Sequence, residues 1–399
     1  MNIIIAGASF PCGVSELGKV ARRQGFAPIF IDHPKNKSTL EDKLFSWITG
    51  DKVPNIFFKQ HGIFLPLLES WVSVGIHLPI GNALRFDRHA AIVSRSKELL
   101  SATLADAGCS HVPRYRVCTL QDALRAAANC GYPVVLRADT GYSSRGIWVA
   151  ESAEELRTVW SLHMKERSSL DFAEMRSVMM ADADNIIIEP WLPGREWSID
   201  CIIRLGRANL IRVCEKATGV VFGRPTTLGY RLTADSALWA EIGAAARKWC
   251  SVLFHTNDFS FACFDIRRNH KNDFVPLDFG VRLGGDCIPL LVRHAGKGRN
   301  PYAAALDAGL TCDMSRMVSP EAGHALIHAF ACRPGAYEGL RIIGQGVVVK
   351  SWKHGLLIGQ RQNGIVHHRV ATVRTYFDNL RDFDIACAKS SEWLQVVVK

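Results

Sequence analysis

The sequence predicts an α/β protein of two or three domains. Strand and helix patterns alternate from the start of the chain to about residue 82, which is typical of a parallel α/β sheet. Residues 186–290 hold mostly strand patterns with one long helix, and the glycine-rich tail from about residue 324 has alternating patterns of a small β subdomain. A chain of 399 residues, at about 150 residues per domain, can bury more than one core.

Composition places the chain among ordinary globular proteins. Its 48% hydrophobic and 22% charged residues exclude intrinsic disorder, and no apolar run reaches the ~18 residues that a membrane helix needs. The opening MNIIIAGASF lacks the basic segment of a signal peptide, and none of the twelve cysteines are spaced CxxC. We therefore expect a cytoplasmic protein with reduced thiols and no membrane partner.

The formal net charge of +10 is spread along the chain, without a block of five or six like charges. Such a diffuse excess suits small anionic substrates such as nucleotide phosphates. No basic stripe or stacking-aromatic motif favours nucleic acid as a partner.

The first thirty residues are predicted to form a strand, a helix and a second strand. Residues 3–6 (IIIA) form a short buried strand, residues 14–24 have helical spacing, and residues 28–31 (PIFI) form the next strand. Gly25 lies where the C-cap of the helix belongs.

The pattern changes at residue 96. The predicted elements are a helix over 96–107, a strand over 115–118, a helix over 120–129, strands over 133–137 and 146–150, and an amphipathic helix over 151–167. Strands over 186–188 and 197–202 and a helix over 236–251 follow.

Three motifs could carry chemistry. The first is the loop at residues 139–146 (DTGYSSRG) between two strands, preceded by Arg137. Small residues let backbone N–H groups approach phosphate oxygens, and the arginine would add a cation. Taken alone, a plain turn explains this loop as well.

The second motif is the segment 189–196 (EPWLPGRE), in which a strand stops at one acid and a second acid begins the next strand. Acids accept bonds from amino or hydroxyl groups, and the segment between them offers backbone groups. Alone, it reads more simply as a turn with two solvated acids.

The third motif places Asp265 and Asp278 thirteen residues apart on adjacent predicted strands, followed by Arg282. A hairpin would bring both carboxylates to one site for a hard cation such as Mg²⁺. The arginine could then hold a phosphoryl group. As an isolated pair, such acids are more often structural ion-pair partners.

Together these motifs resemble the signatures of the ATP-grasp superfamily, and the segment 189–196 matches its E-x-x-[L/I]-x-G-x-E hinge in full. The order of the motifs is most similar to carboxylate–amine ligases of the amino-acid or dipeptide ligase type. The resemblance implies the ATP-grasp fold, with an N-terminal parallel α/β domain (1–95), a lid subdomain (96–185), a β-rich nucleotide-binding domain (186–320) and a C-terminal β subdomain (321–399).

The resemblance also implies roles for individual residues. Arg282 and Arg137 would be catalytic, Asp265 and Asp278 would hold Mg²⁺ or Mn²⁺, and Glu189, Trp191, Leu192 and Glu196 would receive the adenine and ribose of ATP. The remaining implied nucleotide contacts are Lys97, Thr140, Gly141, Ser143, Ser144, Gly146 and, more weakly, Lys216.

Three departures from the pattern of the superfamily concern four positions. Arg137 replaces a lysine, Asp265 and Asp278 replace glutamates, and Gly280 replaces an asparagine that often ligates metal. Arginine keeps the charge but is planar and bulkier. Because the charged positions keep a cation or an acid of the same sign, we expect an active enzyme.

The implied reaction is ATP-dependent joining of a small-molecule carboxylate to an amine through an acyl phosphate. A bicarbonate-dependent amine carboxylase and a non-catalytic nucleotide-binding protein stay open as alternatives. Residues 218–231 and Arg293 could border the substrate pocket, although a plain strand–turn explains part of that stretch equally well. A homodimer is the default expectation. His324 and His328 share one face, but their apolar surroundings favour ordinary strand histidines over a metal site.

Overall fold

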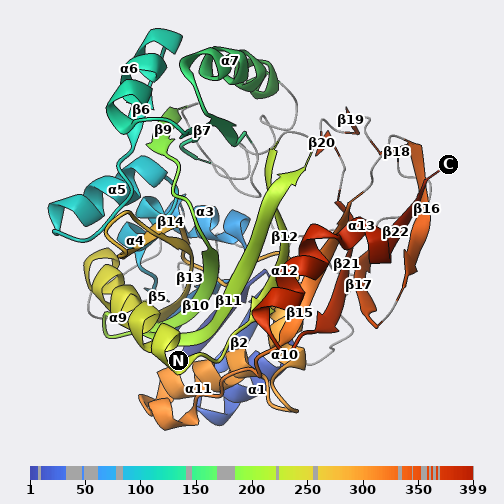
Figure 1. The fold of residues 1–399 in the computed structure, drawn as a ribbon. Helices are drawn as coiled ribbons and strands as arrows, with labels where there is room; N and C mark the ends of the chain where they lie inside the picture. Colours follow the sequence, from blue (N-terminus) through green and yellow to red (C-terminus); the bar gives the residue numbers. More distant parts are fainter. Residues whose placement is uncertain are drawn as a thin grey trace.

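The structure is a computed structural model of the whole chain (Figure 1). It describes residues 1–7, 10–32, 47–48, 62–77, 84–140, 146–168, 185–221, 224–254, 259–330, 335–343, 345–351, 357–358, 361–362, 365–366 and 369–398.

The N-terminal part is a parallel sheet, as predicted. Its strands, in the order β3-β2-β1-β4-β5, are β3 (Trp47–Ile48), β2 (Ala27–Ile31), β1 (Asn2–Ala6), β4 (Gly62–Pro66) and β5 (Leu84–Arg85). Helices α1 (Val14–Arg23) and α3 (Glu69–His77) connect them. Gly25 adopts a left-handed φ of 78° just after α1, which ends the helix as expected.

Two short helices lead to a second sheet. They are α4 (Arg88–Val93) and α5 (Lys97–Asp106), and the Ser96 hydroxyl caps α5 by accepting from the Leu99 N–H at 3.0 Å. The second sheet has the order β6-β9-β7-β8 and consists of β6 (Tyr115–Val117), β9 (Ile186–Pro190), β7 (Val134–Ala138) and β8 (Trp148–Ala150). Its pairs are antiparallel.

Helices α6 (Leu120–Cys130) and α7 (Ala153–Arg167) pack beside each other against this second sheet and share its small core (Figure 1). The predicted strands and helices of residues 96–167 are thus present within one to two residues of their expected bounds. We call this four-stranded sheet with its two helices the lid. The predicted Gly141, Ser143 and Ser144 lie outside the described residues.

The largest sheet has eight strands in the order β14-β13-β10-β11-β12-β15-β21-β17. They are β10 (Glu196–Arg204), β11 (Arg207–Val221), β12 (Arg224–Leu232), β13 (Phe259–Arg268), β14 (Phe274–Gly280), β15 (His324–Phe330), β17 (Val347–Ser351) and β21 (Arg369–Tyr376). All of its pairs are antiparallel. Helix α9 (Ser236–Leu253), which matches the predicted helix, packs with α5 in one core of this sheet.

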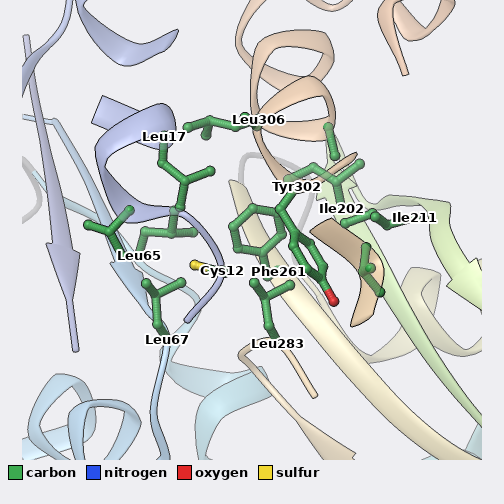
Figure 2. Close-up of a cluster of buried hydrophobic side chains, with 14 of the residues drawn as sticks. Cys12, Leu17, Leu65, Leu67, Ile202, Ile211, Phe261, Leu283, Tyr302 and Leu306 are labelled. Atoms are coloured by element: carbon green, nitrogen blue, oxygen red, sulfur yellow. The ribbon is translucent and has the colours of Figure 1, made fainter. Parts of the chain in front are cut away.

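A second core joins the large sheet to the N-terminal sheet. Helices α10 (Ile288–His294) and α11 (Pro301–Thr311) contribute to it, together with α1 and β4. Figure 2 shows Leu17 and Leu65 of the N-terminal part facing Phe261 and Tyr302 in this cluster. The N-terminal sheet and the large sheet therefore share buried apolar contacts.

The C-terminal residues are mostly β, as predicted, but three of their strands extend the large sheet. The other elements are β16 (Gly335–Ile342), β18 (Leu357–Ile358), β19 (Arg361–Gln362), β20 (Ile365–Val366), β22 (Leu394–Val398), α12 (Leu380–Ala388), α13 (Ser390–Trp393) and a 3₁₀ turn at Met314–Arg316. Strand β15 pairs with β12, so hydrogen bonds cross the expected boundary at residue 321. The four domain ranges remain a prediction.

Across the described helices, none combines the length and the apolar character needed to cross a membrane.

Candidate active site

One cavity of about 730 Å³ lies between the lid, the large sheet and the loop that follows β14. Ten of the side chains predicted to act in the site line it: Lys97, Arg137, Glu189, Trp191, Leu192, Glu196, Lys216, Asp265, Asp278 and Arg282. Thr140 and Gly146, the described ends of the glycine loop, are not among its described lining residues.

The two predicted metal-binding acids occupy a hairpin, as expected. Asp265 on β13 and Asp278 on β14 are direct partners in the antiparallel register, so their side chains leave the sheet on the same face. Their side chains are 35% and 38% exposed, and both line the cavity. A β-bulge follows Asp265. The pairing that the sequence spacing predicted is therefore present.

Three cations surround this pair of aspartates. The Lys216 ammonium lies 3.0 Å from Asp265, the Lys97 ammonium lies 3.7 Å from Asp278, and the Arg137 guanidinium lies 4.0 Å from Asp278. Lys97 is only 4% exposed, and burial lowers its pKa, although the charge of Asp278 partly opposes that shift. For Lys216, burial works to lower the pKa, but Asp265 and Glu196 outweigh it and raise the pKa well above the usual value.

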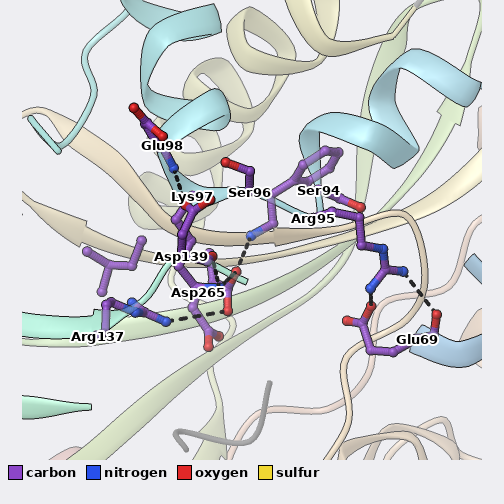
Figure 3. A network of polar contacts seen from close by, with 12 residues as sticks. Glu69, Ser94, Arg95, Ser96, Lys97, Glu98, Arg137, Asp139 and Asp265 are labelled. Atoms are coloured by element: carbon purple, nitrogen blue, oxygen red, sulfur yellow. Dashed lines mark hydrogen bonds and ion pairs between the residues drawn. The ribbon is translucent and has the colours of Figure 1, made fainter. Parts of the chain in front are cut away.

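Asp139 ties Lys97 to the lid. The Lys97 ammonium donates to the carbonyl of Asp139 at 3.2 Å, and the Asp139 carboxylate accepts from the Glu98 N–H at 2.8 Å (Figure 3). Asp139 follows β7, whereas Lys97 and Glu98 begin α5. These bonds hold the start of α5 against the end of the strand that carries Arg137.

The first hinge acid, Glu189, is committed to two arginines. Its carboxylate accepts from Arg114 at 2.7 Å and from Arg137 at 3.3 Å. Burial works to raise the pKa of Glu189, but these two guanidinium groups outweigh it and lower the pKa. Arg114 also donates to the carbonyls of Lys97 and Leu277, both at 2.6 Å. Glu189 and Arg114 together therefore connect the start of the hinge to α5 and β14.

The second hinge acid, Glu196, forms ion pairs with Lys216 and Arg267. Burial opposes its ionisation, but these cations keep the pKa of Glu196 below its usual value. The Arg267 guanidinium lies 4.6 Å from the ring centre of Trp191 and also donates to the Leu192 carbonyl. The Trp191 N–H donates to the Pro133 carbonyl at 3.0 Å. The hinge is thus held between the lid and the large sheet.

Arg282 is held by an acid from the N-terminal part. The first residue of α3, Glu69, accepts from the Arg282 Nε at 2.5 Å and also pairs with Arg95 at 2.5 Å. Burial works to raise the pKa of Glu69, but Arg282 and Arg95 outweigh it and hold the pKa at about 2. Arg282 further donates to the Leu283 carbonyl at 2.6 Å. Its guanidinium therefore has a fixed orientation beside the cavity.

Gly280, which stands where the resemblance implied an asparagine, has little space for a side chain. A Cβ at this position would lie 3.1 Å from the Cys263 sulfur and 3.4 Å from the Arg282 side chain. The half-buried Cys263 thus fills the space that a larger side chain at residue 280 would use.

The two suggestions for a substrate pocket have different outcomes. Thr218, Thr226, Thr227 and Tyr230 of the stretch 218–231 line the cavity. Arg293 instead pairs with Glu16 at 3.2 Å and is not among the described lining residues.

The two histidines of β15 behave as ordinary strand residues. His328 is fully buried beside Thr372 and Arg369, and His324 packs against the Tyr376 ring. Within the described ranges, no three His, Cys, Asp or Glu side chains are arranged to hold a metal ion.

Sequence reasoning missed Arg114 and Glu69. Glu69 lies just past the carboxyl end of β4, where parallel α/β sheets place ligand-binding residues, so its position carried a usable signal. Arg114 lies in an irregular segment before β6, and its three partners come from β9, α5 and β14. No local pattern reveals such a set of partners.

Comparison with known families agrees with this geometry. A model of the ATP-grasp domain matches residues 130–290, which include β7–β14 and the loop with Arg282. Residues 130–290 thus form an ATP-grasp domain.

Solved ATP-grasp structures resemble the whole chain in fold. L-amino acid ligase from Bacillus licheniformis has a TM-score of 0.66 at 14% identity, covering 100% of this chain and 98% of that chain. N5-carboxyaminoimidazole ribonucleotide synthetase from Thermotoga maritima has a TM-score of 0.64 at 11% identity, with coverage of 100% and 99%. The biotin carboxylase domain of 2-oxoglutarate carboxylase from Hydrogenobacter thermophilus, in complex with MgADP and bicarbonate, has a TM-score of 0.62 at 12% identity, with coverage of 100% and 91%. At these identities the likeness establishes the ATP-grasp fold of the chain.

Proposed function

We propose that this protein is an ATP-dependent ligase that activates a carboxylate as an acyl phosphate and joins it to an amine. The observation that carries the proposal is the in-register pair Asp265–Asp278, which faces the same cavity as Lys97, Arg137 and Arg282. Two acids amid cations can hold a metal-bound triphosphate and the phosphoryl group that it transfers.

The donor set at the aspartate pair suits Mg²⁺, or Mn²⁺ in its place. Both ligands are hard carboxylate oxygens, and Mg²⁺ is commonly held by one or two carboxylates together with substrate phosphates and water. Asp265 and Asp278 would hold the ion, which when bound neutralises and orients phosphate oxygens.

Hinge contacts support a place for the adenine. Because the Glu189 carboxylate already binds Arg114 and Arg137, we assign the adenine edge to the backbone of Trp191 and Leu192. The Trp191 N–H and the Leu192 carbonyl are bonded within the protein, so the assignment falls on the Trp191 carbonyl and the Leu192 N–H. Glu196 would lie towards the ribose. Lys97, Arg137 and Lys216 would contact phosphates.

The reaction would proceed in two steps. A carboxylate oxygen attacks the γ-phosphorus of ATP, the bond to the bridging oxygen breaks, and ADP leaves with the electron pair. The amine nitrogen then attacks the acyl carbon, the bond to the phosphate oxygen breaks, and phosphate leaves as the amine loses a proton. Arg282 and Arg137 would stabilise the charge on the phosphoryl oxygens as it shifts.

Replacing one metal-binding acid tests the proposal. We expect Asp278→Ala to lower amine-dependent phosphate release by about 10²-fold or more, because a ligand of the metal site is lost. The assay is ADP and phosphate release with amino acids offered singly and in pairs, with mass analysis of the product. The exposed Asp106→Asn on α5 is the matched control, and thermal unfolding checks that both variants fold. Unchanged release in Asp278→Ala would contradict the mechanism.

A bicarbonate-dependent amine carboxylase is the second candidate, because the fold resembles a carboxylase domain solved with MgADP and bicarbonate. ADP formation that requires bicarbonate would favour it. A non-catalytic nucleotide-binding protein is a third, motivated by Gly280 and the shorter Asp pair. Nucleotide binding without ADP formation across the acid and amine panel would favour that alternative. A cytoplasmic location and a homodimer remain expectations.

A further inference from the structure

Three aspartates on the large sheet and its following loop are each about one-third exposed and line the cavity. The exposed fraction of the side chain is 35% for Asp265, 38% for Asp278 and 35% for Asp286. Three of the glutamates that line the cavity, namely Glu69, Glu189 and Glu196, are at most 17% exposed and are held by two cations each. The other two, Glu151 and Glu155, are exposed and belong to the lid side of the cavity. The proposed metal site uses Asp265 and Asp278, which leaves Asp286 without a role.

Asp286 lies beyond the metal site, along a continuous line of contacts. The Lys216 ammonium that touches Asp265 lies 5.8 Å from the ring centre of Tyr230. The Tyr230 hydroxyl in turn donates to the Asp286 carboxylate at 3.1 Å. Asp286 also accepts from Arg369 of β21, so it lies where the cavity meets the C-terminal strands.

Asp286 also belongs to the same loop as Arg282. Only Leu283, Gly284 and Gly285 separate them, and a Cβ at Gly285 would meet nothing within 4 Å. Arg282, Gly285 and Asp286 all line the same cavity, so the arginine proposed to hold the phosphoryl group and the Asp286 carboxylate border one shared space. A second substrate held by Asp286 would approach an acyl phosphate from this side.

The backbone and the C-terminal strands fix the Asp286 side chain. Asp286 and Cys287 have left-handed φ values of 57° and 65°, which two consecutive non-glycine residues adopt only where their surroundings hold them. One carboxylate oxygen of Asp286 accepts from Arg369 at 2.8 Å. The Arg369 guanidinium lies 3.3 Å from His328 Nε2, and His328 Nδ1 lies 3.0 Å from the Thr372 hydroxyl.

The carboxylate stays ionised in this setting. Burial works to raise the pKa of Asp286, but Arg369, His328 and the hydrogen bonds from Arg369 and Tyr230 outweigh it and hold the pKa far below the usual value. An ionised carboxylate only accepts hydrogen bonds and offers about four lone-pair positions. It is well suited to binding a cation and poorly suited to removing a proton.

We propose that Asp286 binds the amino group of the second substrate as an ammonium, so that this substrate is a cationic primary amine. The bound ammonium releases one proton to water before its nitrogen attacks the acyl carbon, and the second proton leaves to water as the amide forms and phosphate departs. This inference rests on the proposed ligase function and names the substrate class for its second step. Tyr230 and Arg369 act as positioning residues that aim the Asp286 carboxylate at the amine.

The test separates the two steps with hydroxylamine, an uncharged nucleophile at neutral pH that traps acyl phosphates as hydroxamates. In Asp286→Asn we expect hydroxamate formation and the KM for ATP to stay within about twofold of the wild type. The KM for a cationic amine should rise roughly tenfold to a hundredfold, because a charge-assisted hydrogen bond is lost. Asp286→Glu keeps the charge and should lose less, and Asp106→Asn should change neither value.

A second measurement needs only the wild-type enzyme. Methylamine is cationic at neutral pH, whereas methoxyamine is neutral and similar in size, and both compete with hydroxylamine. We expect methylamine to be effective at a concentration roughly tenfold lower than methoxyamine.

Each outcome decides a different point. If the wild-type enzyme forms no hydroxamate with any of the carboxylates, the proposed function is overturned, and this inference with it. If Asp286→Asn forms hydroxamate and its KM for the amine is unchanged, only the inference is overturned. Equal potency of methylamine and methoxyamine would likewise overturn only the inference. Loss of hydroxamate in Asp286→Asn also overturns it, because it places Asp286 in the first step.

Discussion

Glu69 illustrates how a single residue organises the site from a distant part of the chain. It begins α3 in the N-terminal part, yet its carboxylate holds Arg282 from the loop after β14 and Arg95 from the segment before α5. Arginine has a planar fork of donors, so these bonds set the plane of the Arg282 guanidinium. The proposed phosphoryl contact thus depends on a residue 213 positions away in the sequence.

The low pKa of Glu69 predicts a stability change in acid. Its pKa is about 2 in the folded protein against a usual value of 4.5, so its contribution is present above pH 4.5 and disappears as the pH falls to about 2. That difference corresponds to about 3 kcal/mol at neutral pH. We expect the free energy of unfolding of Glu69→Gln to fall less steeply than that of the wild type over this range.

Urea unfolding at a series of pH values measures this difference. The exposed Glu154→Gln on α7 is the matched control and should follow the wild-type curve. Parallel curves for Glu69→Gln and the wild type between pH 4.5 and pH 2 would contradict the ion-pair interpretation.

Among the elements, the loop after β14 depends on a buried ion pair beneath it. Arg212 and Asp200, on β11 and β10, are both fully buried and joined by two hydrogen bonds of 2.7 and 3.0 Å. Asp200 also accepts from the Gly284 N–H at 2.8 Å and from the Tyr302 hydroxyl at 2.8 Å. This anchor fixes the segment that joins Arg282 to Asp286.

Gly284 therefore has a packing role that its neighbour lacks. A Cβ at Gly284 would lie 2.3 Å from the Arg212 guanidinium and 3.1 Å from the Asp200 carboxylate, whereas one at Gly285 would meet nothing within 4 Å. Because this ion pair is buried and hydrogen-bonded, displacing it would break buried hydrogen bonds and cost free energy. We expect Gly284→Ala to lower the free energy of unfolding by about 1–3 kcal/mol, and Gly285→Ala by less than about 0.5 kcal/mol. Urea unfolding of both variants measures this, and equal effects would contradict the argument.

The hairpin β13–β14 was the element that the sequence predicted best. Two apolar segments ending in acids thirteen residues apart fit an antiparallel pair. The strand alternation then determines which side chains share a face. The hinge acids were equally visible as a motif. Their partners Arg114 and Arg267 were not, because ion pairs between separate elements leave no periodicity in the sequence.

At the scale of the whole molecule, the shared core couples the N-terminal sheet to the large sheet. Leu17 of α1 and Leu65 of β4 are fully buried in the same cluster as Ile202 and Phe261. The predicted boundary at residue 95 separates sheets, but these contacts cross it. The N-terminal part and the large sheet should therefore unfold together.

Replacing a leucine in this core tests the coupling. We expect Leu17→Ala to lower the free energy of unfolding by about 2–5 kcal/mol, since it removes fully buried methyl groups, and to shift one cooperative transition. The control Leu162→Ala, at a position 43% exposed on α7, should cost less than about 0.5 kcal/mol. Thermal unfolding followed by circular dichroism and tryptophan fluorescence would reveal the contrary result, an early separate transition of the N-terminal part.

The sequence by itself determined the order of the elements, the parallel N-terminal sheet, the hinge and the aspartate hairpin. These features depend on local periodicity and on spacing within adjacent segments. Tertiary structure alone decided what each charged side chain contacts. It paired Glu69 with Arg282, Arg114 with Glu189 and Arg369 with Asp286. It also joined the C-terminal strands to the large sheet. The physical reason is that such contacts are made between residues far apart in the chain, and only the packing of the sheets brings those residues within hydrogen-bond distance.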